Sequence, residues 1–355
     1  MTEAIYFIIL AILVLPALDY FLALYILPDV KPSVHSVSLP TAVSAIIACH
    51  NEEVNIERKV REINDQLSNA GVPHFEIIVI SDGSIDDSNR ILERLDKQGL
   101  IKFIKIDSRG GKPGALKLGI SHSMHSVLLF SDVRQTLSTD AVKSLLSRLT
   151  DPKIGGATSQ LQLSGDTSST RKWMNHLKLR ESRKGSTIGM CGALYVVRKE
   201  LIDELSPDTI LDDLLMSLFV MRHGKRVVLE PTAIVHDVSW NEFYTTRRQG
   251  RITAGLIQLL RSHSNLIASI SLLQVLFLYG QKYMKYTAPV LFATASITAL
   301  FSEALTMWHY SFTIVIAALL TLFKPIFIAQ ILKLTLGYMA QLLRLDKFSK
   351  VKWDR

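Results

Sequence analysis

Carboxylates and a glycine directly follow a run of apolar residues in the segment EIIVISDGSIDD, residues 76–87. The four β-branched residues 77–80 predict a buried parallel strand, and open α/β sheets bind ligands at the carboxyl ends of such strands. Asp82 is therefore expected at the mouth of a cleft, beside a sharp turn that Gly83 allows. The alternative is a capped turn between a strand and a helix, because Asp and Ser also cap helices.

A glycine-rich basic loop, RGGKP at residues 109–113, precedes a predicted helix. Backbone amides at a helix N-terminus favour anions, and Lys112 adds positive charge. The GxxxxGK[ST] spacing of a Walker A loop is absent. The loop is thus either an anion site or a solvated turn.

Two acidic residues, Asp212 and Asp213, begin a helix that we predict over residues 209–223. The helix dipole favours ionised carboxylates there, although simple N-terminal capping is an equal alternative. Arg248 and Arg251 belong to a basic cluster, RRQGR, that precedes a largely apolar helix.

The elements that must position these residues alternate between strand and helix from residue 42 to 130. Strands are predicted over residues 43–49, 75–81, 100–106 and 126–131, and helices over 53–67, 86–98 and 113–122. This alternation predicts a parallel sheet with right-handed crossovers. Polar residues end every strand, at 50–52, 82–84, 107–109 and 132, so one edge of the sheet would gather them.

The middle of the chain mixes elements. A helix over residues 171–184 has cationic and apolar faces, and it would lie along the membrane or the acceptor site, or else present a solvated charged face. Small residues at 189–195 lead into a strand, and residues 227–230 form a further strand.

Composition indicates a membrane-bound protein with a cytosolic part. Of the 355 residues 48% are hydrophobic, and the net charge is +8. No nucleic-acid-binding motif accompanies this charge, so anionic lipid and a phosphate-bearing substrate are the expected partners. Cys49 and Cys191 are far apart in apolar surroundings, which indicates reduced thiols in the cytosol.

Apolar segments at both ends are long enough to cross a bilayer. Residues 5–27 predict a retained N-terminal anchor, in which Asp19 faces other helices or an interface. Residues 286–302 and 304–323 predict a transmembrane hairpin, 325–343 an interfacial helix, and 344–355 a basic cytosolic tail. The expected domains are an anchor (1–30), a catalytic domain (40–260) and a membrane segment with its tail (261–355). Three crossings would need an oligomer to form a polymer channel.

Seven motifs in this order, between apolar segments, resemble the membrane-embedded glycosyltransferases of family 2, the group of cellulose, hyaluronan and poly-N-acetylglucosamine synthases. They lie at residues 46–53 (IIACHNEE), 81–84 (SDGS), 111–115 (GKPGA), 130–134 (FSDVR), 192–195 (GALY), 211–213 (LDD) and 247–255. The resemblance implies a GT-A fold, with a Rossmann-like mixed sheet that binds nucleotide sugars.

The resemblance assigns roles to individual residues. The nucleotide-sugar site would consist of His50, Asn51, Glu52, Asp82, Gly83, Lys112, Asp132 and Arg248. Asp213 would be the catalytic base, with Asp212 in place of the family's Glu, and Arg251 would lie over the diphosphate and the acceptor. Asp132 would hold Mg²⁺ or Mn²⁺ on the diphosphate.

Two motifs depart from the family. The Asp-x-Asp motif reads Asp132-Val-Arg134, so one carboxylate, phosphates and water would have to hold the cation. Arg134 could instead pair with a phosphate or a carboxylate, and His236 is another candidate ligand. The family's Gln-x-x-Arg-Trp ends in Arg251-Ile252, which removes an acceptor-stacking Trp.

These residues predict an inverting glycosyltransferase of the cell membrane, with a cytosolic catalytic domain. It would transfer a sugar from a UDP-sugar to a hydroxyl of a polysaccharide or glycolipid. Two alternatives are a single-sugar transferase acting on a polyprenyl phosphate and a non-catalytic membrane scaffold.

Overall fold

The structure, a computed structural model, describes residues 2–31, 38–164, 169–238 and 242–299. It divides into two compact units. Among the described residues, the larger unit lies within 28–242 and 260–271, and the smaller consists of 2–27, 243–259 and 272–299.

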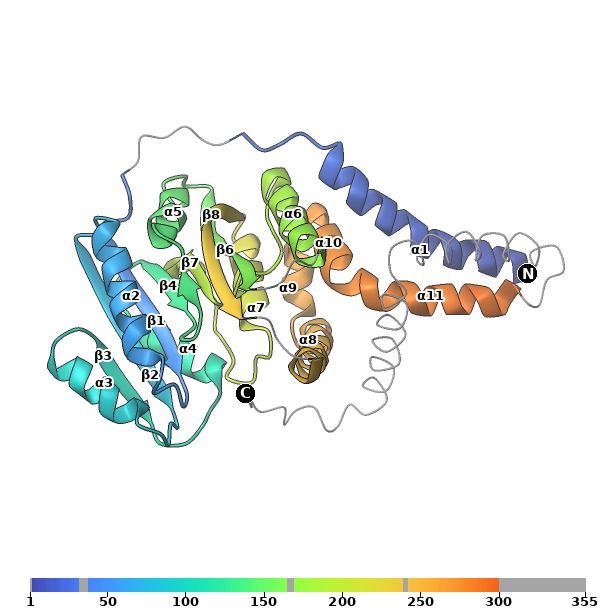
Figure 1. Ribbon diagram of the computed structural model, residues 1–355. Coiled ribbons are helices and arrows are strands. Elements are labelled where there is room, and N and C mark those ends of the chain that lie inside the picture. The colour runs from blue at the N-terminus through green and yellow to red at the C-terminus, as the bar shows by residue number, and fades with distance from the viewer. Residues whose placement is uncertain (1, 32–37, 165–168, 239–241, 300–355) are drawn as a thin grey trace. The chain divides into compact units, whose positions relative to one another are not determined.

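The larger unit is built on an eight-stranded mixed sheet with the order β3-β2-β1-β4-β7-β6-β8-β5 (Figure 1). Strands β1, β2, β3 and β4 are parallel, as the alternating pattern predicts. Strand β7 then runs antiparallel to both β4 and β6, and β5 runs antiparallel to β8. The strands are β1 (Ala42–Cys49), β2 (His74–Asp82), β3 (Lys102–Ile106), β4 (Val127–Ser131), β5 (Thr136–Leu137), β6 (Ile154–Ser164), β7 (Leu194–Arg198) and β8 (Arg226–Val238).

Five helices of this unit confirm the predicted positions to within a few residues: α2 (Ile56–Asn69), α3 (Ser88–Lys97), α4 (Lys112–His122), α6 (Ser169–Lys184) and α7 (Asp212–Arg222). The unit also contains α5 (Ala141–Arg148) and α9 (Ser264–Ser269), and α9 was not predicted. Helix α2 begins three residues later than predicted, because Glu53 bonds to the loop before α3 instead: its backbone N–H donates to Asp86, and its carboxylate accepts from Asp87. Helix α5 and strands β5 and β6 were not predicted.

The main core lies between one face of the sheet and helices α2, α3 and α5. Helix α2 contributes Ile56, Val60 and Ile63, all fully buried and spaced along one helical face. Helix α4 packs on the opposite face, where Gly119 meets Ile46: a Cβ at residue 119 would lie 2.5 Å from that side chain. This close approach brings the N-terminus of α4 to the carboxyl edge of β1 and β2.

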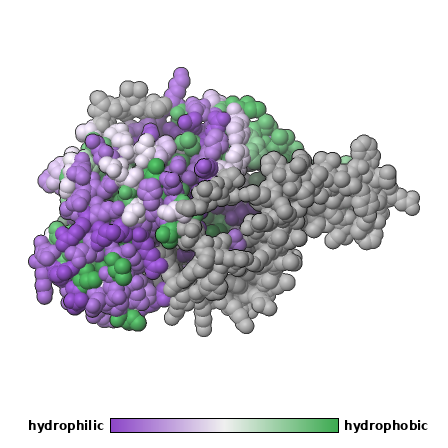
Figure 2. All heavy atoms as spheres, viewed as in Figure 1, coloured by the Kyte–Doolittle hydropathy of each residue, from purple (hydrophilic) through white to green (hydrophobic). Residues whose placement is uncertain are grey.

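Helix α6 is partly buried against the sheet, which neither interpretation of its sequence anticipated. Its C-terminal half packs on β8, with Glu181 and Lys184 buried, while Lys172 and Trp173 near its start are exposed. The face of the larger unit visible in Figure 2 is mostly hydrophilic, with small groups of apolar residues.

The smaller unit packs helix α1 (Thr2–Tyr25) along α11 (Met284–Ala299) (Figure 1). It also contains α10 (Leu272–Leu278), a π-helical turn (Tyr279–Tyr283) and most of α8 (Glu242–Ser262). The ring of Tyr20 packs against Phe277 and against Gly280, where a Cβ would lie 2.4 Å from the ring.

One helix in the described part of the chain, Glu3–Tyr25, is long and apolar enough to cross a membrane. Most of its large apolar side chains are exposed, as contact with lipid would require. Asp19 is exposed, so it does not face another described helix. Transmembrane helices at both ends are not confirmed, because α11 has 16 residues, and the rest of the predicted hairpin, the interfacial helix and the tail lie outside the described residues.

Candidate active site

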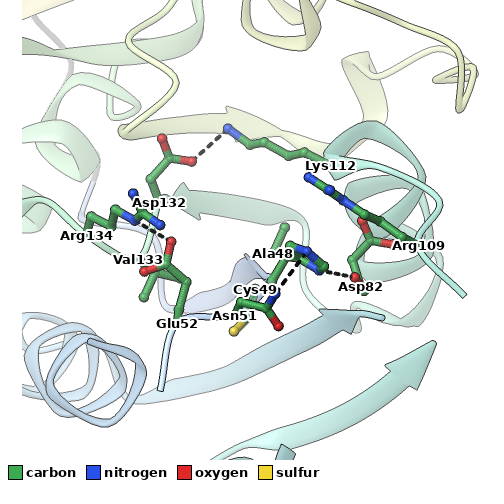
Figure 3. A pocket seen from close by; sticks show the side chains of 11 residues that line it. Ala48, Cys49, Asn51, Glu52, Asp82, Arg109, Lys112, Asp132, Val133 and Arg134 are labelled. Atoms are coloured by element: carbon green, nitrogen blue, oxygen red, sulfur yellow. Dashed lines mark hydrogen bonds and ion pairs between the residues drawn. The ribbon is translucent and has the colours of Figure 1, made fainter. Parts of the chain in front are cut away.

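A pocket of about 350 Å³ lies where strands β1, β2 and β4 end (Figure 3). Six of the predicted nucleotide-sugar residues line it. Its lining is Ala48, Cys49, His50, Asn51, Glu52, Asp82, Arg109, Lys112, Asp132, Val133 and Arg134. The sequence-based expectation that the polar strand ends gather at one edge of the sheet is therefore confirmed.

Asp82 holds the glycine-rich loop. Its two carboxylate oxygens accept hydrogen bonds from the N–H groups of Gly110, at 2.7 Å, and Gly111, at 2.8 Å. Gly83, next to it, has φ +66°, and a Cβ there would lie 2.7 Å from the backbone nitrogen of Arg109. The carboxylate is 3% exposed, so its first task is to fix the loop from which Lys112 projects.

The loop after β1 is bonded to the loop after β2. His50 Nδ1 lies 2.6 Å from the carbonyl oxygen of Asp82. Asn51 has φ +53°, donates its N–H to Ser84 Oγ and accepts the N–H of Ile85 at 2.9 Å. These bonds join the two loops into one wall of the pocket.

Arg134 stands where the family motif has its second carboxylate. Its Nε donates to Glu52 Oε1 at 2.5 Å. Burial of Glu52, which is 8% exposed, makes this bond a fixed part of the pocket wall. Of the two roles considered for Arg134, pairing with a carboxylate is the one observed.

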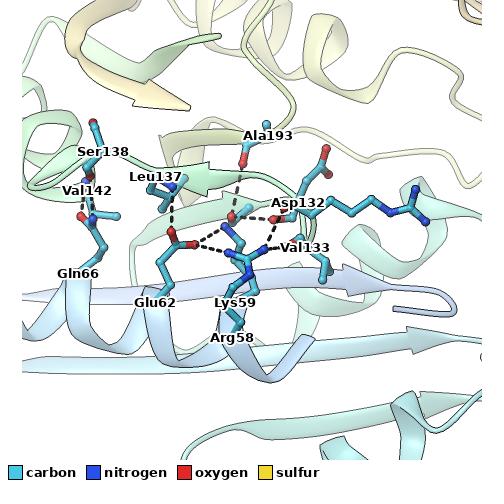
Figure 4. A network of polar contacts seen from close by, with 12 residues as sticks. Arg58, Lys59, Glu62, Gln66, Asp132, Val133, Leu137, Ser138, Val142 and Ala193 are labelled. Carbon is cyan, nitrogen blue, oxygen red and sulfur yellow. Dashed lines mark hydrogen bonds and ion pairs between the residues drawn. The ribbon is translucent and has the colours of Figure 1, made fainter. Parts of the chain in front are cut away.

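Helix α2 holds the loop that carries Asp132 (Figure 4). Arg58 Nη2 donates to the carbonyl oxygens of Val133 and Arg134, at 3.1 and 2.9 Å. Glu62 accepts the N–H of Leu137 at 2.8 Å, and its other oxygen pairs with the fully buried ammonium of Lys59. One polar face of α2 thus fixes the backbone of this loop.

Lys112 joins the pocket to the first turn of α7. Its Nζ lies 2.8 Å from Asp132 Oδ1, 3.6 Å from Asp212 Oδ2 and 3.4 Å from the carbonyl oxygen of Gly192. Burial disfavours the charged ammonium, but Asp132, Asp212 and Asp213 outweigh it, so the pKa of Lys112 is raised. The lysine is a fixed cation at the centre of an acidic group.

Asp212 and Asp213 occupy the first turn of α7, as predicted. Asp213 Oδ1 accepts the N–H of Leu214 at 2.8 Å. Its Oδ2 faces Gly192, where a Cβ would lie 3.5 Å from that oxygen and 3.6 Å from Lys112 Nζ. The carboxylates of this turn therefore lie near the ammonium of Lys112.

Three predicted residues are not among those that line the pocket. His236 is on β8, in register with Thr136 of β5, and does not line the pocket. Arg248 and Arg251 are on α8, in the smaller unit.

Sequence reasoning missed two residues. Arg109 lines the pocket, and the basic glycine loop could have indicated it. Tyr195 on β7 is fully buried, and the pKa of its hydroxyl is raised by burial and by Asp212, Asp213 and Asp132. A tyrosine within a predicted strand does not indicate from the sequence that its hydroxyl will be buried under the influence of three carboxylates.

Comparisons with known proteins agree with this geometry. Residues 44–206 match the family model "Glycosyl transferase family 2", and residues 157–324 match "Glycosyl transferase family group 2". Poly-beta-1,6-N-acetyl-D-glucosamine synthase of Staphylococcus aureus (strain COL) is 23% identical over 219 residues, which are 58% of this chain and 51% of the relative. The Staphylococcus epidermidis synthase is 22% identical over 204 residues, 54% of this chain and 48% of the relative.

The chain therefore spans about half the length of these curated relatives. Among solved structures, the mannosyltransferase PcManGT from Pyrobaculum calidifontis, in complex with GDP-Man and Mn²⁺, has a TM-score of 0.71 at 20% identity. That match covers 98% of this chain and 100% of the mannosyltransferase. It shows that the two chains share a GT-A-like fold.

Proposed function

This chain belongs to glycosyltransferase family 2, and we propose that it is an inverting enzyme that transfers a sugar from a nucleotide sugar to a hydroxyl group. The donor would be a UDP-sugar, and the acceptor a polysaccharide or glycolipid. The observation that carries the proposal is the position of Lys112, between Asp132 of the pocket and Asp212 beside Asp213. One cation thereby connects a diphosphate-sized pocket to a candidate base.

The donor would enter the pocket with its nucleoside over His50 and Asn51. Its diphosphate would lie against Lys112 and Arg109, whose charges offset the negative charge that grows on the leaving group. The bonds from Asp82 hold the loop that carries both cations, so little ordering would be needed on binding.

Asp213 would accept the proton of the acceptor hydroxyl. The hydroxyl oxygen then forms a bond to the anomeric carbon, while the bond from that carbon to the phosphate oxygen breaks and the nucleoside diphosphate leaves. A single displacement from the opposite side inverts the anomeric configuration. A well-placed general base contributes about 10²- to 10⁴-fold to such a rate.

A divalent cation could bind in the pocket only if the donor and water supplied most of its ligands. The described residues contain no group of three or more His, Cys, Asp or Glu side chains suited to a metal. Asp132 supplies one carboxylate in the pocket wall, and the donor's phosphates and water would complete the oxygen ligands that Mg²⁺ or Mn²⁺ prefers. When bound, the cation would offset charge on the diphosphate. His236, the other candidate ligand in the sequence, is not among the residues that line the pocket.

Membranes that carry the full-length chain should release nucleoside diphosphate from one member of a panel of UDP- and GDP-sugars. GDP-mannose belongs in the panel because PcManGT was solved with it. Asp213→Asn should reduce release at least 100-fold while nucleotide-sugar binding persists. Asp208→Asn, at an exposed residue of the loop before α7, is the matched control and should retain activity. Substantial turnover by Asp213→Asn would refute the assignment of the base.

A single-sugar transferase acting on a polyprenyl phosphate is the second candidate. One observation favours it: Ile252 stands where the family's polymerising members have a stacking Trp. Product analysis separates the two, since one sugar on each lipid would indicate the single transfer and a ladder of products the polymerase. For either candidate, the exposed apolar helix α1 would keep the enzyme at a membrane, with the catalytic unit in the cytosol.

A further inference from the structure

Arg134 lines the candidate active-site pocket and uses only one of its three guanidinium nitrogens in contacts with the described residues. Its Nε donates to Glu52 Oε1 at 2.5 Å. Neither Nη group donates a hydrogen bond to another described residue, and the side chain is 45% exposed where it lines the pocket. The two Nη groups carry parallel N–H donors, which match two oxygens of a phosphate. This edge of the guanidinium is therefore available to a ligand in the pocket.

Glu52 holds the guanidinium in a fixed position. Its backbone N–H donates to Ser88 Oγ at 2.9 Å, and its carbonyl oxygen accepts the N–H of Asn55 just before α2. Its second carboxylate oxygen accepts from Asn55 Nδ2 at 3.3 Å. Arg58 bonds to the backbone of Arg134 at the same time, so both ends of the arginine side chain are held. Binding a ligand with the Nη groups would then need little further ordering.

The charges that line the pocket balance because residue 134 is an arginine. The lining contains three carboxylates and three cationic side chains: Glu52, Asp82, Asp132, Arg109, Lys112 and Arg134. An aspartate at residue 134, as in the family's motif, would leave four carboxylates and two cations, and that lining would repel a diphosphate unless a divalent cation entered with it. In this chain Arg134 and Arg109 lie on opposite sides of the pocket (Figure 3), so cations border a bound diphosphate on both sides.

We propose that Arg134 binds the donor diphosphate directly through its two Nη groups. It would supply charge that the family's second Asp provides through a metal ion. The nucleotide affinity of this chain then depends on the guanidinium more than on a divalent cation. The inference rests on the proposed function, because it requires a nucleoside diphosphate in this pocket, and it adds a donor-binding residue to that function.

The test is Arg134→Gln in the full-length chain in detergent, with the Kd of UDP and of GDP measured by calorimetry in EDTA and in Mn²⁺. Wild type should bind one of the two nucleotides nearly as tightly in EDTA as in Mn²⁺. Arg134→Gln should raise that Kd in EDTA about 10- to 100-fold, because charge-assisted hydrogen bonds to a phosphate are lost. The affinity for the free nucleoside, which has no phosphate, should stay unchanged.

Two further substitutions at the same residue separate charge from geometry. Arg134→Asp restores the family's second carboxylate, so it should lose nucleotide binding in EDTA, and Mn²⁺ should restore the affinity about tenfold or more. Arg134→Lys keeps a cation beside Glu52 and should fold even if the removal of the charge prevents folding. Its ammonium lacks the paired donors of the guanidinium, so the Kd in EDTA should rise about threefold to tenfold.

Arg148→Gln is the matched control. Arg148 donates its Nε to Glu230 in a pair of the same kind, with an arginine that is 45% exposed and a glutamate that is 5% exposed, and it does not line the pocket. This variant should leave the Kd unchanged. The inference is wrong if Arg134→Gln and Arg134→Lys bind nucleotide as wild type does in EDTA, or if EDTA abolishes binding by wild type. A wild-type chain that binds neither UDP nor GDP in either condition would instead refute the proposed function itself.

Discussion

Replacing Asp82 by Asn should release the glycine-rich loop and, with it, Lys112. The carboxylate accepts two backbone N–H groups, at 2.7 and 2.8 Å, in a site that is 3% exposed. An amide keeps one acceptor oxygen, but its NH₂ group meets the second N–H donor to donor. One charge-assisted bond is lost and the other becomes neutral, which should cost about 2–4 kcal/mol.

The substitution should lower the free energy of local opening of the loop and leave global unfolding little changed, because the strands beneath the loop keep their own hydrogen bonds. A reduction of about 2–4 kcal/mol in opening free energy would raise hydrogen exchange at the amides of Gly110 and Gly111 roughly 30- to 1,000-fold. Hydrogen exchange followed by mass spectrometry on peptides covering residues 107–116 would measure it. The affinity for nucleotide sugar should fall together with the protection, since Lys112 would no longer be held in place.

The matched control is Asp107→Asn, which makes the same change in the turn before this loop, at a side chain that is 95% exposed. It should leave exchange and binding unchanged. Unaltered protection of Gly110 and Gly111 in Asp82→Asn would show that the loop does not depend on this carboxylate. Lost nucleotide affinity with full protection would instead indicate direct contact between Asp82 and the nucleoside, as the sequence resemblance implies.

Three further predictions concern the rest of the larger unit. Arg58→Ala removes both hydrogen bonds to the backbone of residues 133 and 134. The activity should therefore fall several-fold, and amide hydrogen exchange in residues 132–137 should become faster. Unchanged hydrogen exchange would show that Arg58 does not hold this loop. Gly119→Ala places a methyl group 2.5 Å from Ile46 and should lower stability by about 1–3 kcal/mol in thermal unfolding, whereas Gly185→Ala, which meets nothing within 4 Å, should not. Burial raises the pKa of the Cys49 thiol from its ordinary 9.0 to about 12, so iodoacetamide at pH 8 should spare this cysteine. The pKa of this thiol is higher in the folded chain than in the unfolded chain. Its contribution to the free energy of unfolding is therefore complete below pH 9 and is lost as the pH rises toward 12. Cys49→Ala should make the free energy of unfolding less dependent on pH in this alkaline range.

The candidate active site could be predicted in part. Strand ends and glycine turns are local features, and they indicated that Asp82, Lys112 and Asp132 would lie at one edge of the sheet, where all three line the pocket. The place of Asp213 in the first turn of α7 was also predicted from the sequence, whereas the catalytic role that the resemblance gives it remains a prediction. Pairings such as that of Arg134 with Glu52, 82 positions apart in the chain, could not be predicted, because neither residue has a local pattern that selects the other.

By itself, the sequence determined the alternating strands and helices, the polar carboxyl edge of the sheet and the apolar N-terminal helix. These follow from side-chain periodicity and turn chemistry over a few neighbouring residues. Only the tertiary structure decided that β7 enters antiparallel between β4 and β6, and that Lys112 comes to lie between Asp132 and Asp212. The reason is physical: strand order depends on which buried surfaces pack best across the whole sheet, and no short stretch of chain contains that information.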